Sequence, residues 1–197
     1  MVIKENALSK SVSVLSPYQS FIHATRYSRW LPDQKRRETW EETVDRLINF
    51  FVSDIAEKIE DAEKRAIAVK TLREEVRPAI ASMKVMPSMR AMMTAGEALR
   101  RDNIAGFNCS YVAVNNKRSF SEALYILLNG TGVGFSCERQ EIANLPEIPG
   151  QVKACDDIIV VGDSKEGWAK AYAKLISSLY QGDIPTVDYS KVRPAGE

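Results

Sequence analysis

The sequence predicts an α/β fold in which a helical layer at the N-terminal end is followed by a βαβ-like unit. Three observations lead to this prediction. Apolar residues in the first half recur at helical spacing, a strand-like run begins at Cys109, and a helix with a second strand-like run comes after it. The 197 residues are enough for one full domain or for a large piece of a bigger one.

The first part of the chain is predicted to be mainly helical. Residues 1–38 show neither a helical nor a strand period, so we expect an irregular arm there. Thr39 and Glu42 then form a capping box, and the apolar residues that follow at helical spacing predict a long amphipathic helix. A second helix is expected over residues 61–77, ended by Pro78 because the residue before a proline disfavours helical geometry.

The second half of the chain alternates strands and helices. A strand is expected over residues 109–114. A second capping box, from Ser119 to Glu122, predicts a helix that ends at Gly130, a residue type that favours helix C-termini. A strand over residues 132–137 follows and completes the βαβ-like order.

Another strand, helix and strand are expected toward the C-terminal end. Residues 158–161 form a short, continuously apolar strand. The next helix begins at Asp163 or Ser164, and we interpret Asp163 as its cap. Residues 186–190 predict one more strand.

The chain is expected to divide into two parts, and its composition excludes several functional classes. We place an N-terminal arm and helical layer over residues 1–85 and a mainly α/β part over residues 86–197. The net charge of +1 gives no electrostatic argument for nucleic acid or a membrane surface, and no apolar run reaches the length of a membrane span. Without a signal peptide or CxxC spacing, the three cysteines predict a cytoplasmic chain with reduced thiols and no metal site.

Cys109 is the main candidate for a functional residue, and its local pattern leaves two interpretations open. It follows Asn108 at the start of the first strand, where a thiol can perform redox or nucleophilic chemistry. A free cysteine also packs well as a small hydrophobic residue. The local sequence does not fix the exposure of the thiol, so both interpretations stand at this point.

The glycine loop 130–134 is not a phosphate-binding loop. Such loops lie between a strand and the N-terminus of a helix, whereas these glycines lie between a helix and a strand. They allow either a tight turn or a close approach of the backbone to a flat ligand such as a base or ribose. His23 is expected to have a packing or surface role, and Asp156 and Asp157 are expected to lie in a loop.

Several segments occur together in the order found in one enzyme family. They are residues 25–32, 37–44, 86–90, 107–109, 132–136, 163–168 and 189–194. Each segment alone is a weak signal, but their collinear order over nearly the whole chain is specific. On these segments the chain resembles the N-terminal portion of a ribonucleotide reductase large subunit, and most of all the class II, adenosylcobalamin-dependent enzymes.

The resemblance implies a fold, an activity and roles for named residues. It implies a ten-stranded α/β barrel, of which this chain supplies the helical layer and the first strands, and the reduction of ribonucleotides to deoxyribonucleotides by thiyl-radical chemistry. Cys109 is then one member of a redox-active cysteine pair. Ser88 is implied to bind the substrate phosphate, Asn108 to lie beside it, and Gly132 to let the backbone approach the base. Asn116 is implied to lie near an allosteric effector site.

The resemblance also implies cofactors and partners. Adenosylcobalamin is the expected cofactor, bound mainly by residues outside this chain, and a metal-containing small subunit is the alternative radical source. The implied partners are the C-terminal part of the reductase, a ribonucleotide substrate, a deoxynucleotide effector, a thioredoxin-like reductant and a second copy of the chain. By itself the chain is expected to be an inactive fragment or split subunit. A non-catalytic nucleotide- or partner-binding module derived from a reductase is the alternative function.

Overall fold

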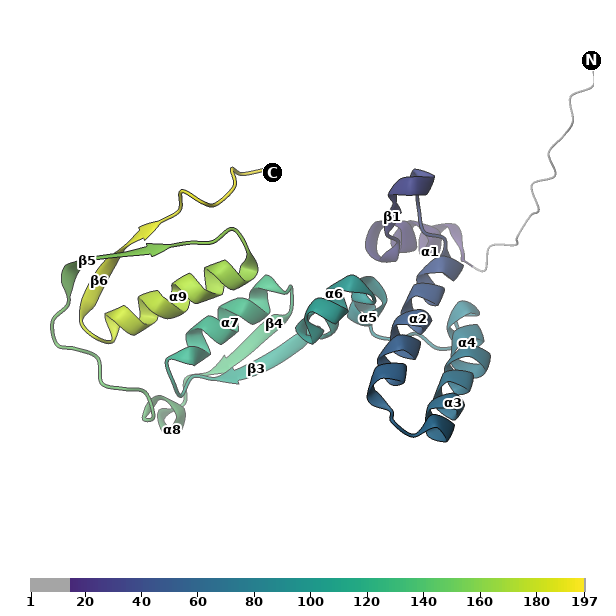
Figure 1. Cartoon of the computed structure of the whole chain (residues 1–197), viewed down its shortest axis with the longest axis horizontal. Coiled ribbons are helices and arrows are strands. Elements are labelled where there is room, and N and C mark those ends of the chain that lie inside the picture. Colours follow the sequence, from purple (N-terminus) through teal and green to yellow (C-terminus); the bar gives the residue numbers. More distant parts are fainter. Residues whose placement is uncertain (1–14, 197) are drawn as a thin grey trace, which may run out of the picture. The chain divides into compact units, whose positions relative to one another are not determined.

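The computed structural model describes residues 15–196 and divides the chain into two compact units. Unit 1 is Met1–Arg100 and unit 2 is Arg101–Glu197. The predicted domain boundary at residues 85 and 86 stays a prediction, whereas the compact units meet after Arg100. Figure 1 shows the helical character of unit 1 and the mixed character of unit 2.

Unit 1 contains helical segments and one short antiparallel ribbon. Its elements are α1 (Pro17–Ile22), η1 (His23–Tyr27), β1 (Trp30–Leu31), η2 (Pro32–Gln34), β2 (Arg36–Arg37), α2 (Trp40–Lys58), α3 (Ala62–Thr71), η3 (Leu72–Val76), α4 (Arg77–Ala81), α5 (Met89–Thr94) and α6 (Glu97–Arg101). The expectation of an irregular arm was therefore wrong for residues 17–37, while residues 1–14 lie outside the described part. Local hydrogen bonds explain the difference, because Ser16 caps α1 with a capping box that the apolar period did not reveal.

The long helix α2 begins where the sequence predicts. The Thr39 hydroxyl accepts the Glu42 amide at 3.3 Å, and the Glu42 carboxylate accepts the Thr39 amide at 2.7 Å, so the capping box is confirmed. The inner face of the helix carries the apolar core of unit 1, with Val44 and Leu47 fully buried. Burial of such side chains is the main source of stability for a helix of this kind.

Pro78 does not end the second helix, contrary to the prediction. The helical path runs from α3 through the π-helical turn η3 into α4, which carries Pro78 in its first turn and ends at Ala81. In η3 the Arg77 amide donates to the Leu72 carbonyl, one residue further back than in an α-helix. This wider turn directly before Pro78 lets the path continue past a residue that lacks a backbone N–H.

Unit 2 consists of two parallel βαβ units with a short helical connection. Its elements are η4 (Asn103–Gly106), β3 (Cys109–Ala113), α7 (Arg118–Leu128), β4 (Gly132–Ser136), α8 (Arg139–Ile142), β5 (Lys153–Val160), α9 (Lys165–Leu179) and β6 (Asp183–Asp188). β3 pairs in parallel with β4, and β5 pairs in parallel with β6. The predicted βαβ order around Cys109 is thus confirmed, and an α/β fold with short sheets is the observed class.

Helices α7 and α9 pack against each other, and each also packs against its own two-stranded sheet (Figure 1). The buried residues Ile159, Val161 and Ala171 join β5 to α9. Asp156 and Asp157 lie inside β5, at an irregularity in its pairing, and not in a loop before the strand as predicted. The strand is longer than its apolar run, because backbone pairing with β6 carries it past the polar residues.

Two predicted helix starts in unit 2 need correction. α7 begins at Arg118, so Ser119 lies within its first turn and does not cap it. The buried Ser119 hydroxyl donates to the Ala113 carbonyl at 2.9 Å, a tertiary contact that a capping pattern does not anticipate. α9 is capped by Ser164, whose hydroxyl accepts the Gly167 amide at 3.0 Å, whereas Asp163 pairs with Arg193.

Candidate functional site

The sheet formed by β3 and β4 places Cys109 beside Gly132. In the parallel register Cys109 lies opposite Gly132, and Tyr111 lies opposite Gly134. Because successive side chains of a strand alternate between faces, these four positions share one face of the sheet. Neither glycine adds a side chain to that face, so the backbone of β4 is bare beside the thiol.

Helix α7 packs on the opposite face of the sheet and covers it in part, since Phe135 on that face is 68% exposed. Val112 and Phe135 share a register position and line a groove of about 390 Å³ together with Phe120 and Leu124 of α7. Cys109 therefore faces away from α7, and its side chain is exposed. Burial as a small core residue, one of the two interpretations of Cys109, does not describe it within this chain.

The glycines around β4 serve different purposes. Gly130 has a φ of +79°, a left-handed conformation that side chains rarely adopt, so it makes the tight turn after α7. A Cβ on Gly132 would stand 3.5 Å from the Asn108 carbonyl oxygen, and one on Gly134 would stand 3.7 Å from the Ser110 carbonyl oxygen. Both are ordinary contact distances, so packing within this chain does not require glycine at either position.

The chain segment that leads into Cys109 is held by backbone hydrogen bonds and by a buried side-chain hydrogen bond. The Gly132 amide donates to the Asn108 carbonyl at 2.9 Å, which sets the first rung between β3 and β4. The Asn108 side chain itself is exposed. Sequence reasoning missed Thr131, which is buried here and hydrogen-bonds to the segment before Cys109. A β-branched hydroxyl residue between two glycines is the signal that could have found it.

A polar cluster holds the turn before β3 against α7. The carboxylate of Asp102 accepts the Tyr125 hydroxyl and the Ile104 amide, and the Lys165 ammonium lies 5.5 Å from the Tyr125 ring centroid. Partial burial works to raise the pKa of Asp102, but these hydrogen bonds and the Lys165 charge outweigh it and hold the pKa below its usual value. The hydrogen bond to Asp102 raises the pKa of Tyr125. The cluster is thus a structural lock for η4.

The remaining predicted site residues lie apart from Cys109 in sequence and have local partners. Ser88 belongs to unit 1, where it caps α5 by accepting the Ala91 amide at 3.5 Å. The side-chain oxygen of Asn116 accepts the amides of Arg118 at 2.8 Å and Ser119 at 3.2 Å, so it holds the first turn of α7.

The other two cysteines are not placed to form a disulfide with Cys109. Cys137 follows the last residue of β4, five positions beyond the partner of Cys109, which corresponds to roughly 16 Å along the strand. A disulfide needs Cα atoms within about 7 Å. Cys155 lies in β5, which belongs to the other sheet. A redox partner for Cys109 is therefore not found in the described residues of this chain.

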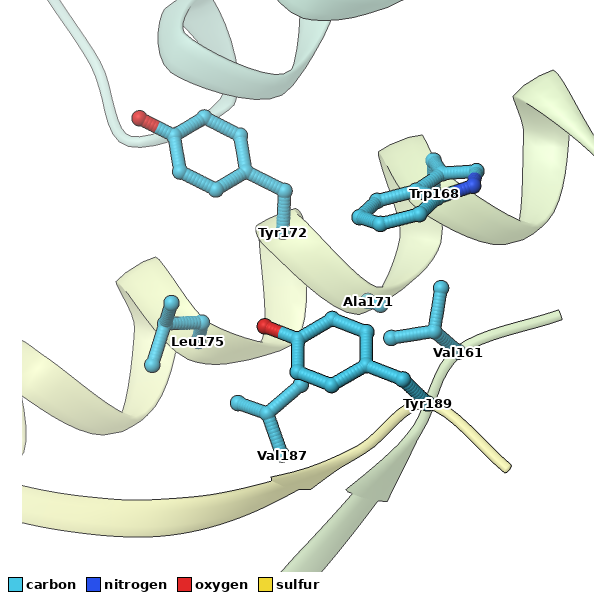
Figure 2. A pocket seen from close by; sticks show the side chains of 7 residues that line it. All are labelled: Val161, Trp168, Ala171, Tyr172, Leu175, Val187 and Tyr189. Atoms are coloured by element: carbon cyan, nitrogen blue, oxygen red, sulfur yellow. The ribbon is translucent and has the colours of Figure 1, made fainter. Parts of the chain in front are cut away.

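A second cavity of unit 2 is apolar and lacks catalytic groups. This cavity of about 80 Å³ lies between α9 and the strands β5 and β6. Figure 2 shows Trp168 and Tyr172 of α9 above, Val187 and Tyr189 below, and Val161 to the right. The cavity lining carries no charged group. Residues 15–196 contain no cluster of three histidine, cysteine or acidic side chains able to hold a metal ion. Within the same range, none of the helices is both long enough and apolar enough to span a membrane.

His23 is the chain's single histidine, and it is a buried packing residue in unit 1. Its Nε2 atom lies 2.9 Å from the Thr43 hydroxyl, and its ring packs edge-on against Trp40. Burial lowers the pKa of His23, the Glu38 charge opposes that shift, and the Arg46 charge adds to it. A neutral ring fits this environment, so a packing role replaces the surface alternative.

Comparison with known proteins gives matches over both units. Residues 5–97 match the ribonucleotide reductase alpha domain. The adenosylcobalamin-dependent ribonucleoside-triphosphate reductase of Lacticaseibacillus paracasei is 25% identical over 232 residues, covering 86% of this chain and 31% of that protein. A protein of Mycobacterium phage D29, provisionally assigned the same activity, is 26% identical over 213 residues, covering 91% of this chain and 29% of its own length.

The fold of the chain is similar to that of a protein of known structure. The crystal structure of a B12-dependent, class II ribonucleotide reductase matches 90% of this chain and 33% of its own chain, with a TM-score of 0.75 and 21% identity. The chain thus spans about a third of the length of the proteins it matches. The chain is therefore similar to the N-terminal region of class II, adenosylcobalamin-dependent ribonucleotide reductases.

Proposed function

We propose that the chain is the N-terminal part of a ribonucleotide reductase and that it works together with the remaining part of such an enzyme. The observation that carries the proposal is the exposed thiol of Cys109 on the sheet face that α7 leaves open. Beside it lies the bare backbone of Gly132 and Gly134. An exposed thiol beside a strip without side chains leaves room for a flat ribose and base to approach the backbone.

The proposed chemistry is a two-electron reduction in which Cys109 supplies one of two thiols. The 2′ C–O bond of the ribonucleotide breaks and a C–H bond forms at the same carbon. The hydroxyl oxygen leaves as water, and two thiols become one disulfide. The second thiol belongs to the remaining part of the enzyme, because Cys137 and Cys155 lie too far from Cys109 or in the other sheet. A thioredoxin-like reductant then restores both thiols.

Three further residues complete the proposed nucleotide contacts. In unit 1, the role proposed for Ser88, at the N-terminal end of α5, is to bind the substrate phosphate. In unit 2, Asn108 contributes its exposed side chain beside the thiol. Gly132 allows the base to approach the strand. Asn116 lies close to the effector nucleotide, where its role is indirect because its side-chain oxygen already holds the first turn of α7.

Adenosylcobalamin is the cofactor named in the related proteins, but the described residues do not form a site that fits it. Four cavities of unit 2 have volumes of only about 80 to 430 Å³, and His23 is committed to Thr43 in the core of unit 1. We therefore propose that the remaining part of the enzyme binds the cofactor.

The open sheets of unit 2 support completion by further strands. Each sheet has only two parallel strands, whereas parallel sheets in proteins are larger and covered on both faces. We propose that both belong to the ten-stranded α/β barrel of a complete reductase. A second copy of the chain is a further proposed partner, because α7 exposes Leu127 and Leu128.

The test is turnover of ribonucleotide by this chain together with the remaining part of a class II reductase. The wild-type complex should form deoxyribonucleotide repeatedly with a dithiol reductant. Cys109→Ser should abolish multiple turnover while leaving substrate binding unchanged, and Cys137→Ser is the matched control that should remain active. Nucleotide or partner binding without any turnover in the wild-type complex would favour a non-catalytic module instead.

A further inference from the structure

Thr131 occupies the turn between α7 and β4 and is almost completely buried, with 1% of its surface exposed. Its hydroxyl oxygen lies 2.9 Å from the Ile104 carbonyl and 2.9 Å from the Phe107 carbonyl. A threonine hydroxyl has one proton to donate, so the two carbonyls share it. The hydroxyl therefore ties the start of β4 to the segment that leads directly into Cys109.

The Thr131 hydrogen bond lies at the position where the register of Cys109 against β4 is set. Gly132 follows Thr131, and its amide donates to the Asn108 carbonyl at 2.9 Å. Phe107, which accepts the Thr131 hydroxyl, is the residue before Asn108. The hydroxyl and the first backbone rung thus fix the same short segment from both strands. The Ile104 carbonyl also accepts the Phe107 amide at 3.0 Å, so the Phe107 carbonyl depends more on the Thr131 hydroxyl. Loss of the hydroxyl would therefore free the residue before Asn108 to shift toward another partner.

We propose that Thr131 is a positioning residue that holds Cys109 in register with Gly132, and this proposal rests on the proposed redox function of Cys109. Thr131 acts through the backbone and touches neither thiol nor substrate. Its removal should change how readily Cys109 forms its disulfide, because that bond tolerates little variation in the separation of its two Cα atoms.

The experiment compares three variants of this chain combined with the remaining part of a class II reductase. Thr131→Val keeps the shape and removes the hydroxyl, and Thr131→Ser keeps the hydroxyl. Ser119→Ala is the control, because Ser119 is equally buried and donates to the Ala113 carbonyl at 2.9 Å at the far end of β3. The fraction of Cys109 in a disulfide is measured by mass spectrometry across glutathione redox buffers, and amide hydrogen exchange is measured at Gly132.

Thr131→Val should shift the thiol–disulfide equilibrium of Cys109 about tenfold and should speed exchange at Gly132. Thr131→Ser and Ser119→Ala should both stay within about twofold of the wild type. Equal shifts in Thr131→Val and Ser119→Ala would overturn the proposal, since they would reflect general loss of stability. If wild-type Cys109 forms no disulfide, the proposed redox function fails, and unchanged Gly132 exchange in Thr131→Val would then overturn the positioning role separately.

Discussion

The two compact units differ in their polar groups: unit 1 hydrogen-bonds a buried polar cluster completely, whereas unit 2 leaves strand edges unpaired. In unit 1 the guanidinium of Arg46 donates to the Glu38 carboxylate and to the carbonyls of Tyr27, Met92 and Ala95, so all five of its N–H groups are bonded. Arg46 and Glu38 are also largely buried, with side chains 13% and 6% exposed. Unit 1 therefore contains, beside its apolar core, a buried Arg46–Glu38 network in which every N–H group of Arg46 is hydrogen-bonded.

Unit 2 instead has short parallel sheets with unpaired strand edges, and large apolar side chains lie exposed on them. Tyr111 and Phe135 are 65% and 68% exposed, and Ile158 in the other sheet is 65% exposed. Each of the two sheets has only two strands. Unpaired edges and exposed apolar residues of this kind favour pairing with more chain. The comparison shows that the buried polar network lies in unit 1, whereas the candidate chemistry lies in the unit whose sheets have open edges.

Removing the carboxylate of Glu38 should have the largest effect on stability. Glu38→Ala leaves the Arg46 charge buried without its partner and also removes an acceptor for the Arg29 amide and the Thr43 hydroxyl. The expected loss is about 3–5 kcal/mol in the free energy of unfolding of unit 1. Urea titration followed by hydrogen exchange of α2 amides measures it.

The matched control for Glu38 is Asp54→Ala, which removes an exposed ion pair with Lys58 on the same helix. That change should cost only about 0.3–0.5 kcal/mol. Similar losses in both variants would contradict the view that the buried Arg46–Glu38 network stabilises unit 1.

Gly167→Ala should destabilise unit 2 by about 1–3 kcal/mol through overpacking. A Cβ at this position would lie 2.4 Å from the Gly162 carbonyl oxygen, at the turn where β5 leads into α9. Gly150→Ala is the control, because a Cβ there meets nothing within 4 Å. Hydrogen exchange of α9 amides should rise in Gly167→Ala alone, and an unaffected α9 would argue against tight packing at this turn.

Ser164→Ala should cost about 1 kcal/mol, because the Ser164 hydroxyl caps α9. Asp163→Ala removes only a half-exposed ion pair with Arg193 and should cost less, about 0–1 kcal/mol. Urea titrations of both variants, followed by the fluorescence of Trp168, compare the two losses. A larger loss in Asp163→Ala would restore Asp163 as the cap of this helix.

The smallest expected effect is a pH dependence in unit 1. Hydrogen bonds from Arg36 and from the Thr39 amide lower the pKa of Glu42 from 4.5 to about 2. A folded pKa below the unfolded value means that Glu42 adds stability above pH 4.5, and that this contribution is lost as the pH falls through about 2. Acid titration should show a shallower loss of stability in Glu42→Gln than in the wild type, and identical curves would contradict this assignment.

Local sequence signals predicted those parts of the structure that depend on local interactions. Thr39 and Glu42 begin α2 as expected, and the apolar periods around Cys109 give the observed βαβ order. The failures arise where longer-range contacts decide. Ser119 serves the Ala113 carbonyl instead of a helix end, and a π-helical turn carries the chain past Pro78. Such contacts leave no periodic trace in a sequence.

The candidate site was predicted through the resemblance, because the pattern around Cys109 alone left its exposure open. The structure adds that the thiol lies on the open sheet face opposite Gly132. The hydroxyl of Thr131 was not predicted, since its two acceptors lie more than twenty residues earlier in the chain. A single sequence does not show which backbone carbonyls will meet a buried hydroxyl.

The central claim is that Cys109 belongs to a redox pair whose second member lies outside the described residues of this chain. The most direct measurement is to oxidise the complex of this chain with the remaining part of a class II reductase and to map its disulfides by peptide mass spectrometry. We expect a disulfide between Cys109 and a cysteine of the complementing part, and we expect a dithiol to reverse it. A Cys109 that stays reduced, or that pairs with Cys137 or Cys155, would contradict it.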